Sequence, residues 1–225
     1  MNSLLAALLS GSGTMFDHNY SVALESGLVE QNDVDWDLMD NWQRATGGVR
    51  VGYAVSPNLE ILGSIHVGSQ SSSYGDYYYE YEDYGYVESS LSGYATNVNE
   101  TLIHLGPKFS WNLTSWFAPY ATVQGLLIHN QLQMSDGYSV DEDDAISFVS
   151  ASAMGVGATG ALGFELRLRP IAKKVQLFTY AETGATGSTA FNFALKDAAA
   201  DVSDVNIGDL GYGGGYYRIG IGTKF

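Results

Sequence analysis

Apolar residues alternate with small or polar ones in several stretches of the chain, with a period of two. Between residues 48 and 55, three valines and a tyrosine take the odd positions, while two glycines, an alanine and Arg50 take the even ones. Successive side chains of a β-strand point to opposite faces, so this pattern predicts a strand with one apolar face. The same alternation resumes over residues 59–67, after Ser56-Pro57-Asn58. The two segments therefore predict a hairpin with a tight turn.

Two further hairpins and two single strands follow the same rule. The second hairpin joins residues 101–111 to 117–127, and the third joins 156–167 to 175–181. In the third hairpin Phe178 and Tyr180 fall on the otherwise polar face, which leaves the parity of that strand open. Segments 20–29 and 216–225 complete the set. The pattern predicts about eight strands.

The connections between these segments alternate in length. Short ones lie near 56–58, 112–115 and 169–174, and long ones near 31–45, 70–98, 134–148 and 188–211. Short turns on one rim and long loops on the other are typical of transmembrane β-barrels, and an even strand number places both termini on the short-turn rim. A soluble lipocalin-like barrel or a β-sandwich also has period-two strands. Alternation alone leaves that choice open.

The polar faces of the predicted strands decide between a transmembrane and a soluble fold, because they carry many ionisable side chains. These are Glu25, Arg50, Glu60, His104, Lys108, Glu165, Arg167 and Arg218. Aromatic residues such as Trp116 and Phe117 gather beside the short turns, as an interfacial girdle requires. Both features favour a barrel that is polar inside and apolar toward lipid. We therefore predict an all-β, transmembrane, antiparallel up-and-down β-barrel with four long outer loops and three short periplasmic turns.

Composition excludes several other classes. The chain has 225 residues and no run approaching the roughly 18 apolar residues of a transmembrane helix. It contains 27 Gly and 16 Tyr but no Cys, which excludes disulfides, thiolate metal sites and cysteine nucleophiles. A net charge of −15 without any basic run argues against a nucleic-acid partner. Residues 1–18 contain a short apolar run and predict an export-signal remnant or a disordered terminus, followed by one barrel domain over 19–225.

Charge is distributed unevenly between the two predicted rims. Most of the 25 acidic residues lie in the four long loops, whereas the third short turn holds Arg169, Lys173 and Lys174. This predicts an acidic outer surface and a basic periplasmic one.

The last ten residues, YYRIGIGTKF, resemble the assembly signal of bacterial outer-membrane proteins. The signal residues are Tyr217, Ile219, Ile221 and Phe225, and Thr223 is the one departure. Segments 45–62 and 105–120 are similar to hairpins of OmpA-like and OmpX-like eight-stranded barrels. The resemblance covers about residues 19–225. It implies residence in a Gram-negative outer membrane, recognition by the barrel-assembly machinery, and contact with outer-membrane lipid and lipopolysaccharide.

An eight-stranded barrel is just wide enough for its own side chains to fill. Glu25, Glu60 and Glu165 can pair with the basic residues of the polar faces, which predicts a satisfied polar plug. The alternative is a gated, low-conductance ion path in which these pairs exchange partners.

Catalytic and metal sites are not predicted. The histidines are His18, His66, His104 and His129. His129 is followed by Asn130 and Gln131, with no neighbouring Ser to resemble the pattern of a lipid-modifying barrel, and ordinary strand positions account better for all four. Two acidic runs, at 33–37 and 141–144, lack the glycine and closing glutamate of a calcium-binding EF-hand loop. We expect solvated acidic loops, no cofactor and no enzymatic activity.

A Tyr-rich segment over residues 74–86 is the strongest candidate for recognition at the surface. Its candidate contact residues are Tyr77, Tyr78, Tyr79, Tyr81, Tyr84 and Tyr86. Tyrosine supplies large contact area at low entropic cost, so this segment predicts a surface for an extracellular protein, a glycan or a phage. Packing among the loops is the alternative. The predicted function is structural or surface interaction; a narrow channel is the second hypothesis and a lipid-modifying enzyme the third.

Overall fold

The structure, a computed structural model, describes most of the chain after residue 18. The described residues are 19–30, 43–76, 81–83, 86–88, 92–136, 147–168, 170–172, 174–189, 191–192, 194–198, 209–210 and 213–225. Within these ranges no helix is long and apolar enough to cross a membrane. The predicted export-signal remnant at 1–18 lies outside them.

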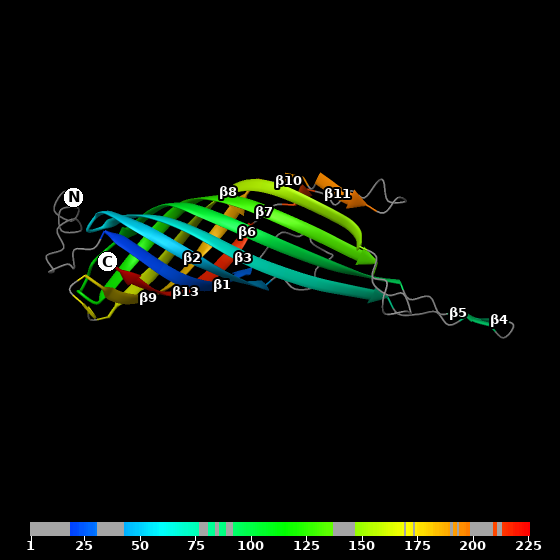
Figure 1. Cartoon of the computed structure of the whole chain (residues 1–225), viewed down its shortest axis with the longest axis horizontal. Helices are drawn as coiled ribbons and strands as arrows, with labels where there is room; N and C mark the ends of the chain where they lie inside the picture. Colours follow the sequence, from blue (N-terminus) through cyan, green and yellow to red (C-terminus); the bar gives the residue numbers. More distant parts are fainter. Residues whose placement is uncertain are drawn as a thin grey trace.

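Eight long strands form one closed antiparallel barrel (Figure 1). In chain order they are β1 (Tyr20–Glu30), β2 (Gln43–Ser56), β3 (Leu59–Asp76), β6 (Ser92–Ser110), β7 (Phe117–Asp136), β8 (Ser147–Arg167), β9 (Gln176–Ser188) and β13 (Gly213–Lys224). Each strand pairs with the next, and β13 pairs with β1 to close the ring. The predicted fold class and strand number are confirmed.

Smaller strands lie between these eight. β4 (Tyr81–Asp83) pairs with β5 (Tyr86–Glu88), and β10 (Phe191–Asn192) pairs with β12 (Asp209–Leu210). β11 (Ala194–Ala198) pairs with the first residues of β8, whereas β9 pairs with its later residues. All of these smaller strands belong to connections that leave the end of the barrel opposite the short turns.

The start of β1 and the end of β13 lie on the rim that carries the short turns (Figure 1). There the amide of Tyr20 donates to the carbonyl of Phe225 at 3.0 Å, and the amide of Phe225 donates back at 2.9 Å. The short connections are 57–58, 111–116 and 168–175. The prediction that termini and short turns share one rim is confirmed.

The strands extend further than the alternation predicted. β3 continues to Asp76 and β6 starts at Ser92, so much of the predicted loop at 70–98 is strand. β7 likewise continues to Asp136. Serine and glycine blur the contrast between the two faces in these segments, yet the backbone ladder needs no such contrast. As a result β3, β6, β7 and β8 have 18 to 21 residues, against 11 to 14 for the other four strands.

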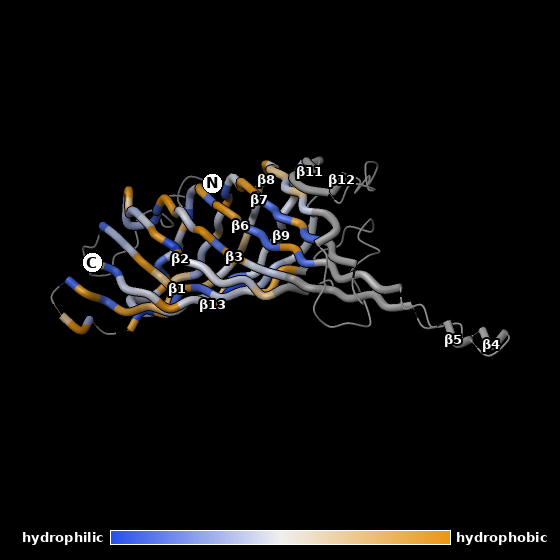
Figure 2. Tube along the Cα trace, turned by 45° about the vertical axis from the view of Figure 1, so that its right-hand side comes forward, coloured by the Kyte–Doolittle hydropathy of each residue, from blue (hydrophilic) through white to orange (hydrophobic). Residues whose placement is uncertain are grey.

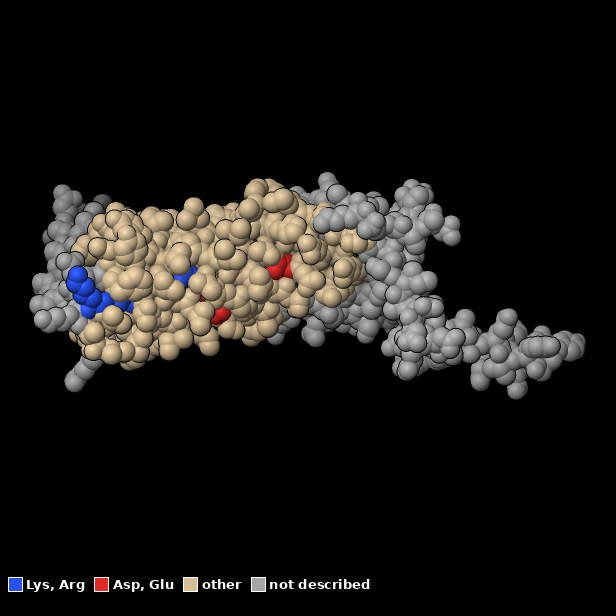
Figure 3. All heavy atoms as spheres, viewed as in Figure 1, with Lys and Arg blue, Asp and Glu red and all other residues tan. Residues whose placement is uncertain are grey.

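Hydrophobic and hydrophilic residues alternate along the strands of the barrel (Figure 2). Exposed apolar side chains cover the outside, whereas the buried polar and charged side chains point inward. Leu24, Leu162 and Ile219 each expose about two thirds of their surface on the outside. Glu25, Arg50 and Glu165 are buried on the opposite faces of neighbouring strands. Figure 3 shows that uncharged atoms make up most of the visible wall and that Lys and Arg atoms gather at the short-turn end. Water-soluble proteins have the reverse distribution.

Candidate functional site in the barrel interior

All eight ionisable residues predicted for the polar faces lie on the inner side of the strands. Glu25, Arg50, His104, Lys108, Glu165 and Arg218 are buried, while Glu60 and Arg167 are partly buried. Period-two geometry explains this placement, because each of these residues follows an outward apolar residue by one position. The eight residues divide into two clusters.

The first, which we call the central cluster, is built on Glu25, Arg50, Glu182 and Arg218. Arg50 donates to Glu182 through both terminal nitrogens, Nη1 to Oε2 at 3.0 Å and Nη2 to Oε1 at 2.7 Å. Its Nε lies 2.9 Å from Glu25 Oε2, and Arg218 Nη1 donates to Glu182 Oε1 at 3.3 Å. Two carboxylates and two guanidinium groups thus neutralise each other across four strands, β1, β2, β9 and β13.

Two histidines adjoin the central cluster. His66 Nε2 lies 2.5 Å from Glu25 Oε1 and 3.1 Å from Ser64 Oγ. His104 Nε2 lies 3.1 Å from Arg218 Nη2. A guanidinium group has no acceptor, so His104 accepts this hydrogen bond. The two imidazole rings meet edge to face with centroids 5.1 Å apart.

The second, which we call the turn-side cluster, lies nearer the short turns. It consists of Glu60, Lys108, Glu165, Arg167 and Lys224. Lys108 Nζ donates to Glu165 at 2.7 Å and to Glu60 at 3.1 Å. Arg167 Nε donates to Glu165 at 2.6 Å, and Lys224 also donates to this carboxylate. Glu165 therefore holds three cations.

Tyrosine side chains connect and brace the two clusters. Tyr120 donates its hydroxyl to Glu182 Oε2 at 2.9 Å, and the ammonium group of Lys108 lies 4.7 Å from the centre of its ring. Tyr180 donates to Glu25 and stacks beneath the guanidinium of Arg50 at 4.5 Å. A cation placed over an aromatic face is attracted to the ring. The two clusters form one continuous polar network.

The inward charges that the structure describes balance. The described inward glutamates are Glu25, Glu60, Glu100, Glu165 and Glu182, and the described inward cations are Arg50, Lys108, Arg167, Arg218 and Lys224. Among these side chains, five carboxylates therefore face five cations. The net charge of −15 belongs to the rest of the chain.

The sequence did not identify several members of the network, chiefly Glu182, Lys224, His66 and Tyr120. A signal was present for the first two. Glu182 has the same parity as Phe178 and Tyr180, and all three are buried inside the barrel. Lys224 has the same parity as Arg218. The parity of the β9 segment was left open because two aromatic rings on the inner face obscure its polarity.

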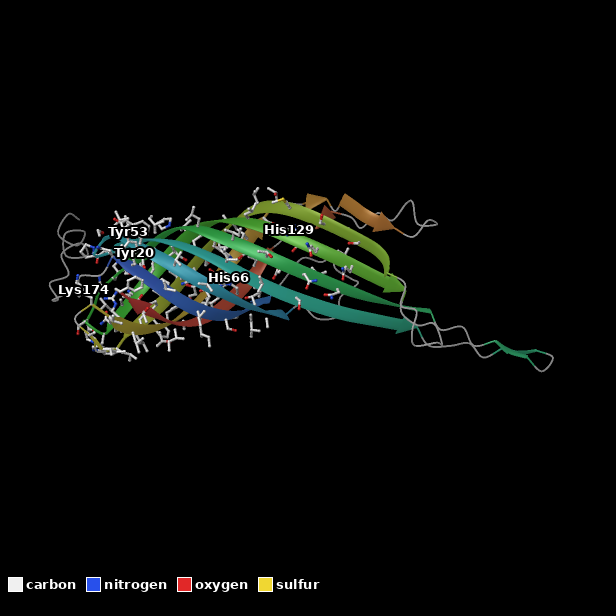
Figure 4. The ribbon with its side chains drawn as sticks, viewed as in Figure 1. Tyr20, Tyr53, His66, His129 and Lys174 are labelled. Carbon is white, nitrogen blue, oxygen red and sulfur yellow. The ribbon has the colours of Figure 1, made fainter. Side chains whose placement is uncertain are left out.

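The predicted assembly-signal residues all point outward. Tyr217, Ile219, Ile221 and Phe225 expose about half or more of their surface. The ring of Phe225 stacks on Tyr20 with centroids 6.2 Å apart, and Tyr20 contacts Tyr53 at 5.4 Å (Figure 4). These rings form part of an aromatic band at the short-turn rim.

The predicted recognition residues cannot be placed in the same way. Tyr77, Tyr78, Tyr79 and Tyr84 lie outside the described residues, and only the strand backbone is described for Tyr81 and Tyr86. The acidic runs at 33–37 and 141–144 also lie outside the described residues. Among the residues that are described, no group of three His, Asp or Glu side chains could hold a metal ion.

A closed antiparallel barrel with an apolar exterior and a charged interior can exist only where the surrounding medium is hydrocarbon. The chain is an eight-stranded β-barrel of the bacterial outer membrane. Its even strand number and the placement of both termini on the short-turn rim are those of bacterial single-chain barrels.

Comparisons with known proteins give similarity in structure only. No protein-family model matches the sequence, and no curated protein matches it. Three similar crystal structures are Ail, the attachment invasion locus protein of Yersinia pestis, OprG from Pseudomonas aeruginosa, and the outer membrane protease OmpT from Escherichia coli.

Ail is 10% identical, with 94% of this chain and 100% of Ail covered and a TM-score of 0.45. OprG is 13% identical, with 94% and 97% covered and a TM-score of 0.47. OmpT is 10% identical, with 96% and 98% covered and a TM-score of 0.42.

Proposed function

We propose that this protein is a non-enzymatic barrel, filled by its own side chains, that holds acidic, Tyr-rich outer loops at the cell surface for adhesion or recognition. The observation that carries this proposal is the continuous ion-pair network across the barrel interior. A barrel of eight strands leaves room for little beyond its own side chains. Here that room is taken by two joined clusters of paired charges.

Paired charges of this kind resist displacement. Separating a buried carboxylate from its cation costs roughly 3 to 5 kcal/mol, because the remaining charge is left unpaired in a protein interior that solvates it poorly. Glu182 has two cationic partners and Glu165 has three. A solute that passes through the barrel would have to disrupt both sets of contacts. The network therefore favours a closed barrel over an open pore.

The charge distribution outside the barrel supports a surface role. The interior is balanced, so the acidic excess lies mainly in the long loops, while Lys174 is exposed at the short-turn rim (Figure 4). The side chains that meet an extracellular partner would be the tyrosines of residues 77–86. An extracellular protein or a glycan is the partner we propose.

Conductance of the refolded protein in planar bilayers tests the closed barrel. We expect no current steps above the bilayer baseline across the usual voltage range. Large, steady steps would contradict the proposal, because they require a water-filled lumen.

A narrow channel is the second candidate, and the shared carboxylates favour it specifically. Glu165 could pass between its three cations, which would open a transient path. Small conductance steps that disappear in Glu165→Gln would support the channel over the closed barrel.

The surface role needs its own test, in which the tyrosines at 77, 78, 79, 81, 84 and 86 are replaced by serine. Cells that display the variant in normal amounts should lose adhesion to a protein- or glycan-coated surface that the parent binds. A control with Lys174→Ser, on the opposite rim, should adhere like the parent. Equal adhesion by all three would show that these tyrosines pack among the loops.

A further inference from the structure

The outer face of the four long strands changes from apolar to uncharged polar along the strand direction. Ile65, Ile103, Leu127 and Val156 are register partners across β3, β6, β7 and β8, and all four are exposed and apolar. Four residues further toward the long loops, the outward partners are Ser69, Asn99, Gln131 and Ser152. The change is complete within roughly 13 Å along the strands, at about 3.3 Å per residue.

We call the polar surface on β6, β7 and β8 the amide patch. It consists of Asn97, Asn99, Gln131, Gln133, Ser150 and Ser152, which are all exposed or partly exposed. Asn99 pairs with Gln131 and Asn97 with Gln133 across the β6–β7 ladder, so the four amides form a square of register neighbours. None of the six carries a charge.

The inner face behind the amide patch is mixed. Val98, Leu102, Ile128 and Leu132 point inward there, and the inward Glu100 and Asn130 lie between them; all six are nearly fully buried. The change along the outer face means that the medium outside the amide patch supplies hydrogen bonds, whereas the medium two rows lower does not.

The amide patch lies next to the lipid-facing surface of the same strands. Only the row of Thr101, His129 and Met154 separates it from the apolar belt. The lipids whose acyl chains contact the apolar belt are therefore the molecules that reach the amide patch. They contact the patch with their headgroups.

The chemistry of the patch selects among headgroups. Phosphate groups are bound by Arg and Lys, and the patch has neither. Amide and hydroxyl side chains both donate and accept, which matches the hydroxyl groups of a sugar.

We propose that the amide patch binds the saccharide headgroup of a glycolipid in the outer leaflet. The proposal rests on the outer-membrane location of the barrel and is independent of adhesion by the loops. Bound glycolipid would fix the rotational setting of β6, β7 and β8 against the leaflet.

The test uses the full chain, refolded into vesicles of phosphatidylethanolamine and phosphatidylglycerol with either core-bearing lipopolysaccharide or lipid A alone. After extraction in mild detergent, native mass spectrometry counts the glycolipid molecules retained. We expect the parent to retain core-bearing glycolipid in several-fold preference. Asn99→Leu with Gln131→Leu should abolish that preference, so that the two glycolipids are retained equally, since one hydrogen bond contributes about fivefold to affinity.

Thr183→Leu on the outer face of β9 is the matched control, because it adds an outward leucine outside the patch; we expect it to keep the preference. If the leucine pair fails to fold, Asn99→Ser with Gln131→Ser shortens the amides without adding apolar surface and should show the same loss. Equal retention of the two glycolipids by the parent would overturn the proposal. So would a preference for lipid A alone, or a preference that survives both double variants. Conductance is not expected to change in any variant, so failure here is distinct from failure of the closed barrel.

Discussion

At the scale of single residues, the barrel interior depends on carboxylates that serve more than one cation. Glu182 accepts hydrogen bonds from Arg50, Arg218 and Tyr120, which come from three different strands. A buried carboxylate with this many partners holds distant strands in one arrangement, because loss of any partner leaves a charge that water cannot solvate.

Arg50→Met should therefore be severely destabilising. The change keeps most of the apolar stem but leaves Glu25 and Glu182 each without their closest guanidinium. We expect a loss of about 3 kcal/mol in the free energy of unfolding, measured by urea titration in lipid vesicles. Lys174→Met removes a cation from the exposed short-turn rim and should change that free energy by less than about 0.5 kcal/mol. Equal urea midpoints for Arg50→Met and the parent would mean that Arg50 is solvated.

The inner residues could be predicted from the sequence, but their pairing could not. Period two places Arg50 and Glu165 on the inner face from their neighbours alone. Arg50 and Glu182, however, are 132 positions apart and on strands that are not register partners. Which inner side chains meet depends on the stagger and diameter of the barrel, and those properties belong to the closed ring.

At the scale of elements, glycines and aromatic rings on neighbouring strands fit together inside the barrel. A Cβ at Gly163 would lie 2.6 Å from the ring of Tyr120, and one at Gly184 would lie 2.8 Å from that of Tyr216. A Cβ at Gly220 would overlap the ring of Tyr180. The glycines give each large ring the space to lie flat against the next strand.

Gly220→Ala should accordingly cost about 2 kcal/mol in the free energy of unfolding, because the added methyl group must move Tyr180 away from Glu25 and Arg50. The comparison is Gly160→Ala on the outer face of β8, where the nearest atom to the new Cβ is 4.0 Å away. We expect that variant to unfold like the parent in the same titration. If both alanine variants unfold alike, the ring of Tyr180 has room that the structure does not show.

Strand length was the property of the elements that the sequence predicted least well. Alternation identifies a strand where its two faces meet different media, and it weakens where both faces are Ser, Gly or Tyr, as over residues 71–75. The amide patch adds a second reason. There the outer face is polar, and the inner face carries Glu100 and Asn130 beside apolar residues, so the two faces differ little in polarity.

At the scale of the whole molecule, the final strand has two roles that can be separated. It is one strand of the folded barrel, and we expect it to be the signal for assembly. Within the fold, Phe225 is one exposed ring of the aromatic band, stacked on Tyr20. Phe109 is a close match, with 49% of its surface exposed against 48% for Phe225. The two residues differ in that only Phe225 lies at the C-terminal end of the last strand.

Phe225→Ala should impair insertion into the outer membrane far more than it affects the folded barrel. In detergent, Phe225→Ala and Phe109→Ala should both melt close to the parent, because each loses the contacts of one interfacial ring. In cells, quantified membrane fractions should be low for Phe225→Ala and normal for Phe109→Ala. If both variants reach the membrane in normal amounts, the C-terminal residues are an ordinary strand end.

The two backbone hydrogen bonds between Tyr20 and Phe225 have a consequence for the order of the chain. They make the junction between β1 and β13 resemble the other seven junctions of the ring, so the chain could be circularly permuted. A short linker would join residue 225 to residue 19, and a new opening at 57–58 would make β3 the first strand and β2 the last. The hydrogen-bonded ladder would be unchanged, whereas the last strand would end at Ser56, followed by Pro57 instead of a terminal phenylalanine. The permuted chain would therefore test separately what the fold requires and what the assembly machinery recognises.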